Sequence, residues 1–324
     1  MENQIQTPHK RRVRYKGKYP KKFEEKYKEL QPEKYKDTIE HVIQKGNTPA
    51  GMHISIMVKE IIDFLNIQPG EIGFDATLGY GGHTKAMLKC LNGKGHIYAT
   101  DVDPEESDKT KKRLADQGFG EDLLTVKLQN FCTIDEIAKE VGGFDFILAD
   151  LGVSSMQIDN PKRGFSFKVD GPLDLRLNQE AGISAAERLD TITRDELAGM
   201  LYENSDEPYC EELAKAITDE IRKGNRIDTT TKLRQVIEKT LDFLPEKEKK
   251  DTIKKTCQRT FQALRIDVNR EFEVLYEFME KLPDALRPGG RVAILTFHSG
   301  EDKLVKKALK EGYKAGIYSD YAKD

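Results

Sequence analysis

The apolar and polar positions in the first half of the chain follow two alternating patterns. Between residues 53 and 65, apolar side chains recur at helical spacing, at positions 54, 57, 58, 61, 62 and 65. Short apolar runs typical of buried strands lie at 72–74, 97–101, 123–128 and 144–150. Helical patterns separate these runs, at 84–91, 104–116 and 134–141. Alternation at this length predicts an α/β fold, a parallel sheet with helices on both faces.

The alternation stops after Asp150 and resumes near residue 269. The intervening pattern is helical, at 184–190, 193–203, 208–223, 229–243 and 246–255. A helix at 269–286, a turn at 287–290, a strand at 291–297 and a helix at 303–311 follow. We therefore expect one discontinuous sheet domain, residues 51–160 and 263–324. Residues 161–262 are expected to form an all-helical insertion, and residues 1–50 a flexible leader.

A glycine-rich turn, Asp75-Ala-Thr-Leu-Gly-Tyr-Gly-Gly-His83, joins the first strand to the next helix. Its glycines let the backbone approach a ligand closely, and the helix N-terminus offers free N–H groups and a partial positive charge. The second strand ends in Asp101, 19 residues after Gly82, near the spacing of about 20 at which an acid binds a ribose. Asp150 ends a later strand, so carboxylates are expected at one edge of the sheet.

The turn favours one nucleotide class over another. In the dinucleotide motif G-x-G-x-x-G, the third glycine would fall on Thr84, which disfavours NAD and a dehydrogenase. The acid-first pattern D-x-x-x-G-x-G-G instead resembles the first motif of S-adenosylmethionine (SAM)-dependent methyltransferases.

Composition excludes several classes of protein. The 324 residues are 34% charged and 37% hydrophobic, no apolar run approaches the ~18 residues of a membrane helix, and the N-terminus lacks the apolar core of a secretory signal. The four cysteines, Cys90, Cys132, Cys210 and Cys257, form no C-x-x-C pair. Neither a metal site nor a disulfide framework is indicated, and a reducing cytoplasm is the expected compartment.

Charge is unevenly distributed along the chain. Residues 1–50 hold 13 Lys/Arg and 7 Asp/Glu, whereas the whole chain has a net charge of −3, so the remainder carries −9. Tyrosines 15, 19, 27 and 35 and Phe23 are interleaved with these cations. Such a leader suits RNA, because rings stack on bases while cations meet phosphates; a solubilising tail is the alternative.

Six stretches together resemble one known family. They are Leu78–His83, Asp150–Ser155, Arg163–Phe167, Gly171–Arg176, Arg259–Ile266, and Phe297–Ser299 with Glu301-Asp302. In this order, over residues 53–307, they resemble the bacterial small-subunit ribosomal RNA (cytosine-N4)-methyltransferases, the RsmH/MraW family. The resemblance implies a class I, Rossmann-like methyltransferase domain with a helical RNA-binding insertion. It also implies SAM as methyl donor, a cytidine in the decoding region of 16S rRNA as acceptor, and ribosomal RNA or the small subunit as partner. The oligomeric state stays open, a homodimer included.

The resemblance also assigns cofactor contacts by position. The residues that fall on the family's SAM-binding positions are Gly81, Gly82, His83, Asp101, Phe131, Asp150 and Gln157. The residue pattern itself also indicates the glycines, Asp101 and Asp150. It does not indicate Phe131 or Gln157, for which core packing and a polar loop position are the alternatives.

The chemistry narrows the catalytic candidates. The exocyclic N4 of cytosine is a poor nucleophile, so the enzyme must align it with the methyl group and accept its proton. Asp150, with the backbone of Leu151–Val153, is the first candidate, orientation of the cofactor or loop being its alternative. His298 is a weaker candidate, because a histidine at a strand end is more often structural.

Substrate contacts are less defined. Asp174 and Arg176 lie on a loop that could cover the cleft, and Arg259 and Arg265 would meet phosphate or pair with an internal acid. The chain also departs from the family pattern at 54–57, at 205–208, and at Gly300, where leucine is usual, and it stops at Asp324. These departures fit a divergent paralogue or a shortened chain, and leave open an RNA-binding paralogue with altered catalysis and a different RNA target.

Overall fold

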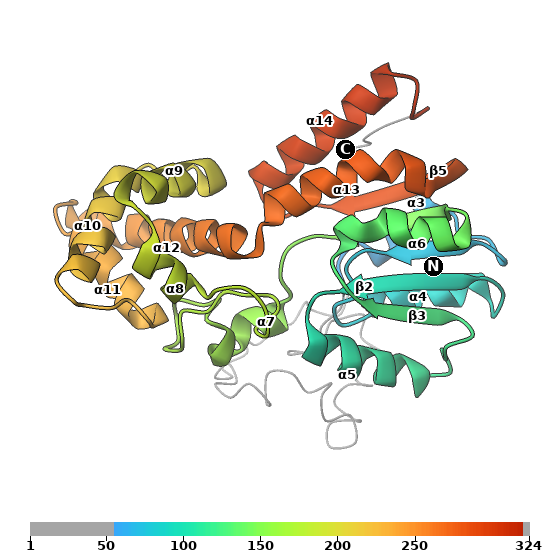
Figure 1. Ribbon diagram of the computed structural model, residues 1–324, viewed down its shortest axis with the longest axis horizontal. Coiled ribbons are helices and arrows are strands. Elements are labelled where there is room, and N and C mark those ends of the chain that lie inside the picture. Colours follow the sequence, from blue (N-terminus) through green and yellow to red (C-terminus); the bar gives the residue numbers. More distant parts are fainter. Residues whose placement is uncertain (1–54, 320–324) are drawn as a thin grey trace, which may run out of the picture. The chain divides into compact units, whose positions relative to one another are not determined.

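Five parallel strands form the sheet in the computed structural model, which describes residues 55–319. The strands are β1 (Ile72–Asp75), β2 (His96–Asp101), β3 (Leu124–Leu128), β4 (Phe144–Asp150) and β5 (Leu286–Leu295). Their order is β3-β2-β1-β4-β5, and every neighbouring pair is parallel (Figure 1). The α/β parallel-sheet prediction is confirmed. The predicted leader lies outside the described residues.

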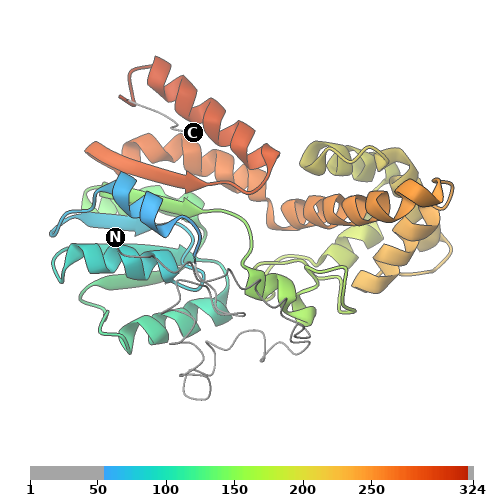
Figure 2. The same ribbon diagram turned by 180° about the vertical axis from the view of Figure 1, so that it is seen from behind.

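Helices cover both faces of the sheet, each over its own core (Figures 1 and 2). On one face lie α3 (Val58–Leu65), α4 (Gly82–Leu91) and α5 (Pro104–Ala115), which bury Ile61, Met87 and Leu114. On the other lie α6 (Ile134–Val141), α13 (Glu271–Ala285) and α14 (Ser299–Lys314), which bury Ile137, Phe278 and Val305. Side chains of β4 alternate between the two cores, as a central strand requires.

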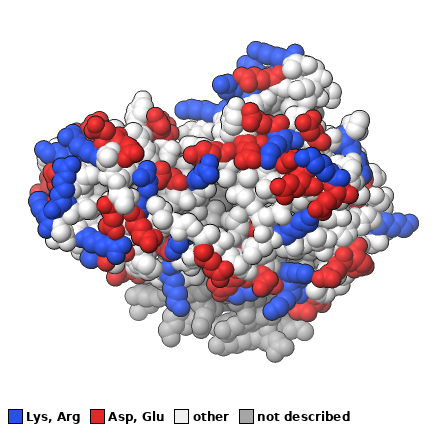
Figure 3. All heavy atoms as spheres, in the orientation of Figure 1, with Lys and Arg blue, Asp and Glu red and all other residues white. Residues whose placement is uncertain are grey.

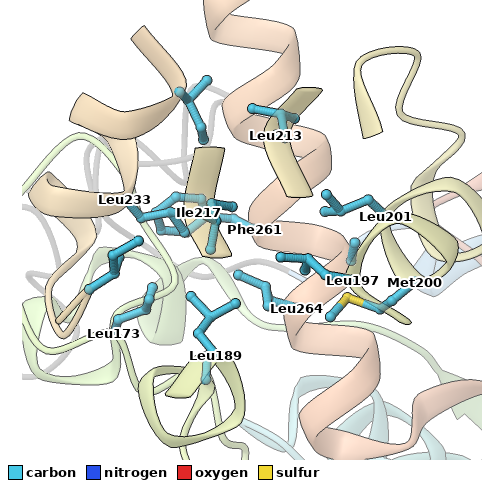
Figure 4. Packing of buried hydrophobic residues seen from close by; sticks show 14 of the residues in the cluster. Leu173, Leu189, Leu197, Met200, Leu201, Leu213, Ile217, Leu233, Phe261 and Leu264 are labelled. Carbon is cyan, nitrogen blue, oxygen red and sulfur yellow. The ribbon is translucent and has the colours of Figure 1, made fainter. Parts of the chain in front are cut away.

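Five helices of the expected insertion share a third core. They are α8 (Ala185–Thr191), α9 (Arg194–Ser205), α10 (Cys210–Arg222), α11 (Thr230–Thr240) and α12 (Glu246–Asn269). Leu197, Leu213, Leu233 and Phe261 from four of them point toward one another (Figure 4). The helix starts are locally encoded, because Ser184 and Thr193 form capping boxes that satisfy free N–H groups of α8 and α9.

The structure extends two predicted elements. The helix predicted at 246–255 continues to Asn269, because Cys257, Phe261 and Leu264 prolong its buried stripe. The proposed domain boundary at residue 262 therefore falls inside α12. The predicted turn 287–290 lies within β5, which pairs with β4 at Phe144↔Leu286 and resumes at Phe146↔Arg291. A register irregularity absorbs the Pro-Gly-Gly segment without ending the strand.

Short helices lie beside β4, after its end and before α6. α7 (Ser155–Asp159) starts at a capping box between Ser154 and Gln157, and a 3₁₀ turn, η3 (Pro161–Arg163), follows it. Another, η2 (Phe131–Thr133), precedes α6. Between residues 55 and 319, none of the helices has the length and apolarity needed to cross a bilayer.

Candidate functional site

The carboxyl ends of β1, β2 and β4 meet where the chain changes direction across the sheet. β1 pairs with β2 on one side and with β4 on the other, so this edge contains the switch point at which α/β sheets bind ligands. Asp75, Asp101 and Asp150 end these three strands. Three acids from distant parts of the sequence therefore lie at one edge of the sheet, where the ligand crevice of an α/β fold is expected.

The glycine turn packs tightly before α4. Gly81 has φ 77°, and a Cβ there would lie 2.7 Å from Thr110 Cγ2 of α5. A Cβ on Gly82 would lie 2.2 Å from Ser55 Oγ. Side chains are disfavoured at both positions, at Gly81 by its positive φ and the Thr110 contact, and at Gly82 because the Ser55 hydroxyl would have to move. This fits the close backbone approach expected for SAM.

Asp101 fastens the turn to β2. Its carboxylate accepts hydrogen bonds from the backbone N–H groups of Gly79, at 2.7 Å, and Asp103, at 2.9 Å. Each oxygen keeps a second lone pair, which can accept from a ribose hydroxyl. Burial raises the pKa of Asp101 to about 6, although the two N–H groups favour the ionised form.

His83 and Asp150 form a pair across the crevice. His83 Nε2 lies 2.8 Å from the carbonyl oxygen of Ile56, and Nδ1 lies 3.3 Å from Asp150 Oδ2. Burial opposes charging of the ring, but the Asp150 carboxylate and the Ile56 carbonyl raise the pKa of His83 overall. Asp150 Oδ1 is buried and has no hydrogen-bond partner among residues 55–319. A buried acceptor of this kind needs a donor from outside the described residues, a ligand or an ordered water molecule.

Asp75 is a member of the site that the sequence reasoning did not assign. It is 1% exposed, and it accepts from Thr84 Oγ1 at 2.6 Å and from the Thr77 N–H at 3.0 Å. Thr77 Oγ1 in turn accepts from the Asp150 N–H at 2.7 Å. Thr84, which stands where the dinucleotide motif has its third glycine, thus holds the turn through a buried hydrogen bond to Asp75. The sequence signal that could have identified Asp75 is its position as the first residue of the D-x-x-x-G pattern.

Phe131 and Gln157 lie on the short helices η2 and α7. The Phe131 ring packs edge-on against Phe278, with centroids 5.2 Å apart. Gln157 accepts from the Ser154 N–H at 3.0 Å and donates to Asp103 Oδ2 at 3.3 Å. Both side chains have structural partners, and their cofactor contacts remain predictions.

A buried ion pair that the sequence did not indicate joins the insertion to this site. Asp103 caps α5 and pairs with Arg163, the last residue of η3. Their exposures are 1% and 6%. Burial lowers the pKa of Arg163. Asp103 is two residues from Asp101, so the start of the insertion is fixed beside the expected ribose position.

The four substrate candidates are engaged in ion pairs. Asp174 binds Arg176 through two contacts of 2.8 Å. Arg265 binds Glu271 at 2.8 and 2.9 Å, and Arg259 lies 4.0 Å from the fully buried Glu207. The internal-acid alternative thus describes the contacts of Arg259 and Arg265. Roles in RNA binding remain predictions for all four.

His298 caps a helix. Its Nδ1 accepts from the Glu301 N–H at 3.4 Å at the start of α14, and its Nε2 lies 3.3 Å from Glu301 Oε1. Glu271 joins these two within 4.8 Å, but it already pairs with Arg265. A catalytic role for His298 remains a prediction, with this structural role beside it.

Gly300 follows this cap at the position where the family usually has leucine. A Cβ on Gly300 would lie 2.5 Å from Cζ of Phe272, and the Phe272 ring also packs edge-on against His298 at 5.7 Å. The phenyl ring therefore occupies the volume into which a side chain at 300 would extend, and the departure is compensated locally.

Comparisons with known proteins show the family of this chain. The sequence is 87% identical to "Ribosomal RNA small subunit methyltransferase H 1" of Agathobacter rectalis over 98% of this chain and 90% of that protein. It is 69% identical to the protein of the same name from Lachnoclostridium phytofermentans over 100% of this chain and 88% of that protein. A solved SAM-dependent O-methyltransferase from Thermotoga maritima aligns over 29% of this chain and 34% of its own, with 16% identity and a TM-score of 0.25. That likeness is too weak to add to the argument. The pattern of the MraW methylase family matches residues 50–318, and this chain therefore belongs to the MraW methylase family.

Proposed function

We propose that this chain transfers the methyl group of SAM to N4 of a cytidine in the decoding region of small-subunit ribosomal RNA. One observation supports the reaction above the others. Asp150 ends a central strand beside the glycine turn, and its buried Oδ1 lacks a hydrogen-bond partner among the described residues. The names of its relatives, both small-subunit ribosomal RNA methyltransferases, supply the RNA class. The reaction takes place in the cytoplasm, where small subunits are assembled.

The residues fit SAM in two ways. The turn disfavours side chains at Gly81 and Gly82, and Asp101 keeps lone pairs for ribose hydroxyls. Bound SAM supplies an already activated methyl group on a sulfonium. The protein's own part is then alignment and removal of a proton from N4, each worth a large factor in rate.

Asp150 is suited to that second task. His83 holds Oδ2 at 3.3 Å, and Thr77 fixes the Asp150 N–H at 2.7 Å. The carboxylate is therefore preorganised, and Oδ1 accepts a hydrogen bond from the attacking N4 and then its proton. The Asp150 carboxylate and the Ile56 carbonyl both favour the protonated form of His83 and raise its pKa.

The insertion supports RNA contact through one part of its surface. Residues 222–255, from the end of α10 into α12, contain 11 Lys/Arg and 6 Asp/Glu, a net charge of +5. On the face shown in Figure 3, cations and acids alternate over the left-hand helices α10 and α11. Exposed pairs such as Lys232–Asp228 and Arg234–Glu238 are worth little in water, so the cations can exchange their partners for phosphates.

The deciding experiment combines small-subunit RNA with tritiated SAM, followed by nucleoside analysis. N4-methylcytidine in the digest is the expected product. Asp150→Asn should lower turnover at saturating SAM by about 10²–10⁴, the range for a positioned acid–base group. Asp108→Asn, an exposed acid on α5, is the matched control and should match wild type.

SAM and RNA affinities must be measured in the same variant. A loss confined to SAM binding would reassign Asp150 to the cofactor. RNA binding without any N4-methylcytidine from the wild-type protein would replace the proposal with the RNA-binding paralogue.

A further inference from the structure

One large aromatic side chain is exposed beside the proposed acceptor. Phe297 follows β5 and is 56% exposed. β5 pairs with β4 in the register Asp150↔Leu295, so Phe297 lies two residues beyond the partner of Asp150. The Leu151 N–H also donates to the Leu295 carbonyl at 3.1 Å, which fixes the turn after Asp150 against this strand end.

The ring lies against the turn that carries Asp150. A Cβ built on Gly152 would be 3.6 Å from Cδ2 of Phe297, which is ordinary van der Waals contact. Gly152 has φ +90°, so the backbone itself also disfavours a side chain here. Glycine at 152 therefore leaves open the space between the ring and the turn.

The backbone of Phe297 is held although its side chain is exposed. Its N–H donates to Glu301 Oε2 at 2.8 Å, and Glu301 is 3% exposed. His298, the next residue, caps α14. A buried carboxylate and a helix start thus fix an aromatic ring at the edge of the crevice, where core packing does not need it.

A base whose exocyclic nitrogen is to react must leave its stack and reach the crevice, which costs stacking energy. Proteins that handle such bases replace the lost stacking with an aromatic side chain. We propose that Phe297 is the platform on which the target cytosine stacks, so that N4 lies toward the turn Asp150–Gly152. This rests on the proposed function and adds a residue that positions the substrate.

The test replaces the ring and then restores an aromatic face. Phe297→Leu should lower kcat/KM for RNA by about 5- to 150-fold, the factor for one base–aromatic stack, with SAM affinity and Tm unchanged. Phe297→Tyr and Phe297→Trp should stay within about threefold of wild type, because they keep a π face. Tyr276→Leu, which removes an aromatic that is 57% exposed on α13, is the matched control and should behave as wild type.

A binding measurement separates stacking from other effects of the substitution. Small-subunit RNA oligonucleotides are prepared with each cytidine in turn replaced by an abasic site. At one position the abasic site should weaken binding to wild type by a factor close to that of Phe297→Leu. The same abasic site should have little further effect on the Leu variant, because both changes remove one stack.

Two results would overturn the proposal. One is equal loss with Leu, Tyr and Trp, since a structural role would show no aromatic rescue. The other is additive losses from Phe297→Leu and the abasic site at every position. Because the binding cycle does not need turnover, it decides on Phe297 even if no N4-methylcytidine forms. Absence of product from wild type would count against the proposed function alone.

Discussion

Acidification should weaken SAM binding through Asp101. This carboxylate accepts from the Gly79 and Asp103 N–H groups, and each of its oxygens keeps a lone pair that can accept from a ribose hydroxyl. Burial raises its pKa from 3.8 to about 6. A protonated carboxyl is a weaker acceptor and brings its own donor, so the ionised form is the one that binds ribose hydroxyls well.

The magnitude follows from the fraction of Asp101 that is ionised. With a pKa of about 6, nearly all of the carboxyl is ionised at pH 7.5 and roughly one tenth at pH 5. The Kd for SAM should therefore rise about tenfold over this range, or about 1.4 kcal/mol. Because the folded protein binds this proton more tightly than the unfolded chain does, the same protonation stabilises the fold as pH falls through 6 toward 4. Loss of affinity through this group is thus not a sign of unfolding.

Isothermal titration calorimetry of SAM at pH 5, 6, 7 and 7.5 measures the effect. Asp101→Asn keeps the size but cannot titrate, so it should bind more weakly at pH 7.5 and lose the Asp101 slope. The variant retains His83, so the contribution of that histidine is the same in both proteins and the difference in slope isolates Asp101. An equal Kd for wild type at pH 5 and 7.5, or an equal slope in Asp101→Asn, would refute the reasoning.

Two further outcomes test the connections around the site. Arg163→Met removes one member of the buried Asp103–Arg163 pair and should lower the free energy of unfolding by about 3–5 kcal/mol in denaturant titrations. Adding Asp103→Asn to the same chain should recover part of this loss. Additive losses would mean that the two residues act separately. Deleting residues 1–45 should weaken RNA binding and flatten its dependence on salt, since fewer counterions are released, while SAM affinity stays constant; an unchanged salt slope would make the leader a solubilising tail.

Local sequence signals predicted the bounds of those elements whose first and last residues are marked by the sequence itself. β4 and α6 occupy the predicted ranges 144–150 and 134–141. The apolar run defines β4, and the amphipathic stripe followed by Gly142-Gly143 defines α6, so neither depends on tertiary contacts for its bounds. In contrast, α12 was expected to end at 255 but continues to Asn269. Its second half packs against α9 and buries Phe261 and Leu264 in the core of the insertion.

The site residues also fall into those that a local pattern predicted and those that only the fold brings together. The spacing between the glycine turn and Asp101 predicted which strand ends would carry acids. It could not show that His83 meets Asp150, 67 residues later in the sequence, or that Asp103 meets Arg163. Such pairs depend on strand order, and a one-dimensional pattern does not encode strand order.

The insertion is tied to the sheet domain at its entry, and its exit helix is tied to its own entry loop. At the entry, Arg163 and Gln157 both bind Asp103 at the start of α5. At the exit, the Asn269 side chain donates to the Leu175 carbonyl and accepts from the Leu177 N–H, both at 2.7 Å. Arg163 itself donates to the Leu177 carbonyl at 3.1 Å, which joins the two ties. A shift of Asp103 would therefore move both Asp101, two residues before it, and the loop that enters the insertion. The buried Asp103–Arg163 pair therefore fixes the entry of the insertion beside the acid proposed to bind the ribose.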